Sequence, residues 1–92
     1  MGANNELPRL TCESDWLDLR DGDRGRLVGK LHSNLEPGSD ALMVTTPDWD
    51  TLHAAIPTGY EGDLIKAGTP VEAVVTRTED GMETATADIK RA

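Results

Sequence analysis

Residues 24–32 read RGRLVGKLH, and side chains of two kinds alternate along this stretch. One set of alternate positions is mostly basic and consists of Arg24, Arg26, Val28, Lys30 and His32. The other set holds two glycines and two leucines. Because successive side chains of a β-strand point to opposite faces, this pattern predicts a strand with one basic and one apolar face.

Four further stretches show strand-like patterns. Apolar side chains alternate with other residues in 52–56, 71–75 and 85–89, and a more continuously apolar run covers residues 41–46. Clusters of glycine, proline and aspartate punctuate the chain, and no helical pattern longer than two turns fits between them. Short strands at such close spacing are typical of a small all-β sandwich or barrel.

The fold expected from these stretches is a small five- to six-stranded antiparallel barrel. A chain of 92 residues allows one domain, which we place at residues 11–92. Two leucines on one side of residues 15–20 predict an extra N-terminal strand. We expect residues 1–10 to be a flexible terminus and residues 60–67 to form one short helical turn.

The register of the final hairpin can be predicted from its apolar residues. A three-residue loop at residues 79–81 pairs Val75 with Ala85, whereas a two-residue loop places Val75 opposite Thr86. A one-residue slip turns every side chain of a strand to the other face of the sheet. The three-residue loop keeps the apolar residues on one face and is therefore favoured, with Gly81 in a left-handed conformation.

Three segments, which together make up about one-third of the chain, lie between residues 25 and 90: GRLVGKL at residues 25–31, IKAGTPVEAVVTRTEDG at 65–81 and ATADIK at 85–90. With the order of the predicted elements, they resemble the OB barrel of ribosomal-type RNA-binding repeats. This resemblance implies a five-stranded barrel that binds RNA. Those repeats carry exposed aromatic residues for base stacking on two strands, where this chain has Met43 and His53.

Acidic residues outnumber basic residues by seventeen to nine, which gives the chain a formal net charge of −8. Three lysines against ten aspartates and ten threonines are a balance typical of proteins from salt-loving microbes. The alternative is an acidic protein from a high-GC genome. In a mesophile this charge argues against a nucleic-acid partner, whereas in a halophile it says nothing about the partner.

Localisation and redox chemistry are constrained by what the sequence lacks. The longest apolar run, residues 41–44, is far shorter than the roughly 20 residues of a membrane span, and no secretory leader is visible. We therefore expect a cytoplasmic protein without a membrane partner, or alternatively a virion component. The single cysteine, Cys12, excludes an internal disulfide and a multi-cysteine zinc site.

The first functional hypothesis is a non-enzymatic module that binds RNA or single-stranded nucleic acid. Its expected site is the basic strand face with one residue upstream, and consists of Arg20, Arg24, Arg26, Lys30 and His32. A row of Lys and Arg can follow a phosphate backbone, because each neutralised phosphate releases counterions. The alternative for this row is a solvated strand face that pairs with acids on a neighbouring strand.

The second functional hypothesis is an acidic protein-interaction module, such as a viral or phage structural component or an inhibitor that mimics nucleic-acid charge. Trp49 stands between Asp48 and Asp50 in a turn, where we expect an exposed indole. The two carboxylates would repel phosphate, so this site suits a protein partner better than RNA. The oligomeric state stays open.

Catalysis, metal binding and cofactor binding have little support in the sequence. The serines lie in no nucleophile motif, and phosphate-loop and dinucleotide glycine patterns are absent. Cys12, His32 and His53 are scattered and lack the close spacing of zinc ligands. We therefore expect a binding protein that is not an enzyme and holds no metal or cofactor.

Overall fold

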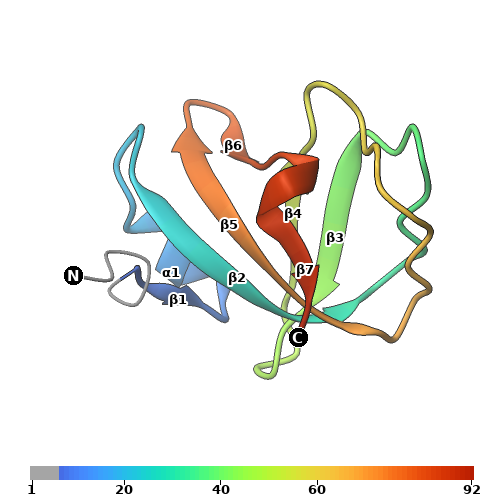
Figure 1. Ribbon diagram of the computed structural model, residues 1–92. Coiled ribbons are helices and arrows are strands. Elements are labelled where there is room, and N and C mark those ends of the chain that lie inside the picture. Colours follow the sequence, from blue (N-terminus) through green and yellow to red (C-terminus); the bar gives the residue numbers. More distant parts are fainter. Residues whose placement is uncertain (1–6) are drawn as a thin grey trace.

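The computed structural model describes residues 7–92 and consists mainly of β-strands (Figure 1). In chain order, its elements are β1 (Arg9–Leu10), α1 (Glu13–Leu17), β2 (Arg24–Leu31), β3 (Ala41–Thr45), β4 (Thr51–Ala55), β5 (Pro70–Thr78), β6 (Gly81–Glu83), the 3-10 helix η2 (Thr86–Asp88) and β7 (Ile89–Arg91). None of the helices in this part of the chain is long and apolar enough to cross a membrane.

Five of the strands close into a barrel. The strand order is β2-β3-β4-β6-β5, and β5 pairs with β2 over seven residue pairs to complete the ring. β1 and β7 flank the ring next to β2 and β5 respectively. The predicted small all-β barrel is therefore confirmed, and its closed five-stranded form is compatible with an OB-like fold. Two pairings, β1 with β2 and β4 with β6, are parallel.

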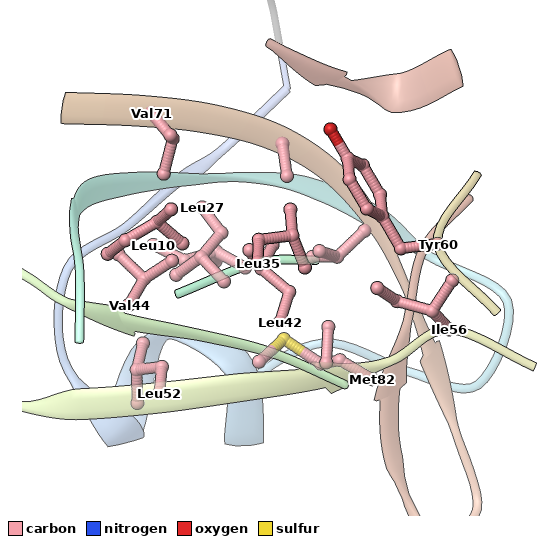
Figure 2. Packing of buried hydrophobic residues seen from close by; sticks show 14 of the residues in the cluster. Leu10, Leu27, Leu35, Leu42, Val44, Leu52, Ile56, Tyr60, Val71 and Met82 are labelled. Atoms are coloured by element: carbon pink, nitrogen blue, oxygen red, sulfur yellow. The ribbon is translucent and has the colours of Figure 1, made fainter. Parts of the chain in front are cut away.

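Apolar side chains from every strand of the ring fill the barrel interior (Figure 2). Along β2, Leu27 and Leu31 are buried whereas Lys30 is exposed, as the alternation predicts. Gly29 occupies an inward position where a Cβ would collide with the carbonyl oxygen of Thr45. The missing side chain therefore lets β3 approach β2 closely where the barrel closes.

The N-terminal boundary of the fold lies earlier than predicted. β1 sets Leu10 opposite Leu27, and Leu10 is fully buried. Its side chain takes the space beside Gly25, where a Cβ would lie 3.0 Å from Leu10 Cδ1. The prediction of a flexible terminus at residues 1–10 is therefore wrong for the two residues of β1, and its first six residues lie outside the described part of the chain.

Residues 15–20, predicted to be a strand, belong instead to α1 and the turn after it. The Asp15 carboxylate accepts hydrogen bonds from the backbone N–H groups of Thr11 (2.8 Å) and Cys12 (3.2 Å), and forms a capping box at the helix start. This local capping outweighs the alternation of the leucines, and Leu17 is left exposed. The extra N-terminal strand of the fold is β1.

Residues 60–67 do not form the predicted helical turn. Tyr60 is buried at one end of the core (Figure 2), and its hydroxyl donates to the Asp63 carbonyl oxygen at 2.7 Å. Ile65 is also buried and forms an isolated bridge with Leu35. These contacts hold the segment against the core without a helix.

The final hairpin has a different register from the predicted one. Its loop contains residues 79 and 80 alone, so that Thr78 pairs with Gly81 and Thr76 with Glu83. The predicted three-residue loop is therefore wrong. Gly81 does adopt a positive φ, of 152°.

The register differs because the C-terminal segment pairs with two strands in turn. The backbone N–H of Thr84 donates to the carbonyl oxygen of Ala55 on β4 at 2.8 Å. η2 then returns the chain to β5, where Ile89 pairs with Ala73. The strand predicted at residues 85–89 is therefore wrong except at Ile89, the first residue of β7, because Thr86–Asp88 form η2 between the two pairings.

Candidate nucleic-acid interface

The basic residues predicted to share one strand face lie together on the outside of β2. Arg24 and Lys30 are exposed and Arg26 is half-buried, whereas the leucines of the strand point into the core. A strand rises about 3.3 Å per residue, so the three cations form a row roughly 20 Å long.

Two cations on neighbouring strands extend this row. Arg9 of β1 pairs with Arg26, and Lys90 of β7 pairs with Glu72 of β5. Paired residues of adjacent strands lie on the same side of a sheet, so both cations join the outer face of β2 and β5. We call this set the cationic face, and it consists of Arg9, Arg24, Arg26, Lys30 and Lys90.

Sequence reasoning missed two members of the cationic face. Arg9 lies in the stretch expected to be flexible, and the apolar Leu10 after it is the sole local sign of a strand. Lys90 lies in the segment expected to form the closing strand, but it joins this face only because β5, its partner strand, pairs with β2 when the barrel closes. The pairing of β5 with β2 is the information that would have revealed Lys90.

Two acidic residues lie on the same side of the sheet as the cationic face: Glu72 of β5, and Glu83 of β6, which pairs with Thr76, the partner of Arg24. Glu72 pairs with Val28, and its Oε1 lies 3.8 Å from Nη1 of Arg26. This contact is the one ion pair found in residues 7–92. It is too long for a hydrogen bond and both side chains are about one-third exposed, so its stabilising effect is small. Among residues 7–92, Arg26 is therefore the one cation of the face that forms an ion pair with an acid on a neighbouring strand.

The two outer members of the predicted site take different places. His32 follows β2, and its Nδ1 lies 3.2 Å from Oγ1 of Thr45, the residue that pairs with Lys30. His32 therefore adjoins the end of the cationic face. Arg20 precedes β2 in a turn, where its backbone N–H donates to the Asp23 carboxylate at 3.1 Å, and it lies outside the strand face.

A groove opens at the end of the cationic face that holds Lys30. Its volume is about 370 Å³, and it is bounded by the ends of β2 and β3, the β3–β4 turn, the first residue of β5 and Ala92 after β7. Most of its lining is apolar and comes from Val28, Pro47, Trp49 and Pro70. A groove of this size and apolar character is typical of small-molecule sites.

Trp49, in the β3–β4 turn, is 86% exposed, as expected from the sequence. Its φ of 68° is the one positive value of a non-glycine residue in the described range. A bulky residue in this conformation costs roughly 1–3 kcal/mol, and such strain concentrates at functional sites. An exposed apolar side chain held at this cost is therefore a candidate binding residue.

The carboxylates that flank Trp49 are engaged with the N-terminal segment. Asp48 accepts a hydrogen bond from the Thr11 hydroxyl, and Asp50 accepts one from the backbone N–H of Glu13, each at 2.9 Å. Both acids thus tie the start of α1 to the β3–β4 turn. The structure keeps Asp48, Trp49 and Asp50 adjacent, but it gives the two acids a structural partner.

Comparisons with known proteins found no relative of this chain. A scan against protein-family models found no match, and searches for similar curated proteins and similar solved structures also found none. Within residues 7–92, no three histidine, cysteine, aspartate or glutamate side chains come together as a metal site. The cationic face and the groove beside it are therefore the candidate functional site.

Proposed function

We propose that this protein is a non-enzymatic module that binds single-stranded nucleic acid, RNA above all, through phosphate contacts on the cationic face. The observation that carries the proposal is the gathering of five of the nine basic residues on one face of a protein with a net charge of −8. Among the described residues, strand pairing also puts two acids on this side of the sheet, Glu72 and Glu83.

The spacing of the cations supports contact with a phosphate backbone. Arg24 and Arg26 are about 6.6 Å apart along β2, a distance close to that between successive phosphates of an extended single strand, and Lys30 lies about 13 Å from Arg26, two such steps further on. Each phosphate neutralised by Lys or Arg releases condensed counterions, and this release supplies sequence-independent affinity. Because phosphate contacts carry no base information, we expect binding that tolerates many sequences.

The second candidate function is an acidic protein-interaction module centred on Trp49. The exposed indole favours it, since exposed aromatic side chains are common anchors of protein interfaces. The engagement of Asp48 and Asp50 with the N-terminal segment argues against it, because these carboxylates already have hydrogen-bond partners. We therefore place nucleic-acid binding first.

The test compares two double variants that change the net charge equally. Arg26→Ala with Lys30→Ala removes two cations from the cationic face, whereas Arg20→Ala with Lys66→Ala removes two exposed cations outside it. We expect the first pair to weaken binding of a labelled single-stranded RNA about 10- to 100-fold at roughly 50 mM salt, and the second pair to weaken it much less. Equal losses from both pairs would show that net charge alone governs binding.

A further inference from the structure

We infer that the groove beside Trp49 receives one nucleobase of the bound strand, stacked on the indole, with a neighbouring phosphate on Lys30. This inference rests on the proposed function and names the part of the nucleic acid that this end of the face would recognise. It also assigns a binding role to Trp49, which phosphate contacts alone do not use.

The groove and the cationic face are continuous. Lys30 lines the groove and is also the last cation of the row on β2, and Val28 connects the two regions on the same strand. Among the lining residues of the described chain, Lys30 carries the one charged side chain. A single-stranded nucleic acid that follows the row of cations toward Lys30 therefore reaches an apolar surface directly beyond the phosphate that contacts Lys30.

The turn that carries Trp49 is fixed in place before any ligand binds. The backbone N–H of Thr46 donates to the carbonyl oxygen of Asp50 at 2.8 Å, and Asp48 and Asp50 are bonded to Thr11 and Glu13. Neither carboxylate lines the groove, whereas the indole does. The base would therefore meet no acid there, and the phosphate, which the two acids would repel, is placed at Lys30. In Figure 1 this turn projects from the lower end of the barrel, close to the C-terminal residue.

The chemistry of the groove favours a nucleobase. A base offers a flat apolar face to the indole and carries its phosphate a short distance away, which matches an exposed tryptophan beside a lysine. Every base has such a face, so stacking fits the sequence tolerance expected of the phosphate contacts. The adjoining row of cations complements a polyanion, which selects nucleic acid over an apolar peptide as the occupant.

The test uses Trp16→Phe as the parent protein, so that Trp49 is the one fluorescent tryptophan. It is titrated with a single-stranded RNA and with an abasic strand of the same length, which has the same phosphates but no bases. We expect the RNA to quench Trp49 fluorescence and the abasic strand to leave it almost unchanged. We also expect the abasic strand to bind about 5- to 150-fold more weakly, the range for loss of one base–aromatic stack.

A variant at Trp49 separates this inference from the proposed function. Trp49→Gly removes the indole and suits the positive φ, so the variant should fold, which its thermal unfolding checks. It should bind RNA and the abasic strand with equal affinity. If both proteins bind RNA in a salt-dependent way but Trp49→Gly binds it as tightly as its parent does, the base site is rejected and phosphate binding stands. No binding of either strand at low salt would reject both.

One further outcome assigns the groove to another occupant. Sedimentation of the parent protein and of Trp49→Gly over a range of concentrations reports self-association. Self-association that Trp49→Gly abolishes, together with unchanged Trp49 fluorescence on RNA addition, would identify a second copy of the chain as the occupant and overturn the inference. A monomer at all concentrations, with quenching by RNA, supports it.

Discussion

The guanidinium group of Arg77 stacks on the indole of Trp16, with its central carbon 4.6 Å from the ring centroid. Arg77 belongs to β5, and its Nη1 also donates to the carbonyl oxygens of Thr78 at 2.6 Å and Gly81 at 3.0 Å. Trp16 belongs to α1 and packs against the core from outside. This stack therefore joins α1 to the β5–β6 hairpin.

Replacing Arg77 should loosen this junction. We expect Arg77→Ala to lower the free energy of unfolding by about 2 kcal/mol, because it removes both the stacking and the two hydrogen bonds. Arg77→Lys keeps the charge but loses the planar fork, and should cost about 1 kcal/mol. Urea unfolding measures both values, and an alanine variant as stable as the parent would show that the stack contributes nothing.

The barrel strands were predictable because burial inside a barrel repeats every second residue. Leu27 and Leu31 in β2, and Val71 and Val75 in β5, are buried at the positions that the alternation assigned to the inner face. α1 was not predictable in this way, because the Asp15 capping box is a local signal that competes with the alternation of the leucines. The alternation of apolar residues is thus enough to predict which strand residues are buried, but it does not predict the N-terminal helix.

The candidate site was predictable only where it lies on one strand. Arg24, Arg26 and Lys30 share β2, so their common face follows from strand geometry. Arg9 and Lys90 reach the same face through pairing with distant segments, and those pairings depend on the closed barrel. The groove likewise depends on the meeting of several strand ends, which no local pattern encodes.

Acid should weaken the attachment of the N-terminal segment. The pKa of Asp15 lies below its ordinary value, mainly because its carboxylate accepts a hydrogen bond from the Thr11 backbone N–H. Partial burial of the carboxylate raises the pKa but by less. A lowered pKa in the folded protein means that the carboxylate stabilises the fold at neutral pH and loses this effect as the pH falls through the folded pKa.

Asp15→Asn tests this effect because it keeps the shape of the side chain but removes the charge. We expect it to lower stability at pH 7 by about 0.5–1 kcal/mol, as is usual for a lost helix cap. The difference from the parent protein should be smaller at about pH 3, because the stabilisation is lost from the ordinary aspartate pKa of about 3.9 downward through the lowered pKa of the folded protein. Urea unfolding at both pH values measures it, and a difference that does not change with pH would contradict the role of the charge.

Gly29 should be among the least replaceable glycines of the barrel. A Cβ at this position would collide with the Thr45 carbonyl oxygen and lie 2.6 Å from Val44 Cγ1, so β3 would have to move. We expect Gly29→Ala to cost about 3 kcal/mol or more. The matched control is Gly38→Ala, which has open space around it and a φ of 93°, and should cost about 1–2 kcal/mol. Equal unfolding midpoints for the two variants would contradict this packing.

Salt should stabilise the folded protein. A net charge of −8 with one weak ion pair in residues 7–92 leaves mostly repulsive interactions between the acids, and salt screens these. We expect the Tm to rise between about 0.05 M and 1 M potassium chloride, and a continued rise into the molar range would support a halophilic source. A Tm that is constant over this range would show that repulsion between acids is unimportant.

The salt dependence of RNA binding tests the central claim of the cationic face most directly. Each phosphate neutralised on a single strand contributes about −0.7 to the slope of log Kobs against log salt concentration, so five contacts predict a slope near −3.5. The variant that lacks Arg26 and Lys30 should then give a slope near −2. A slope close to zero, or no binding at about 100 μM oligonucleotide in low salt, would contradict the account.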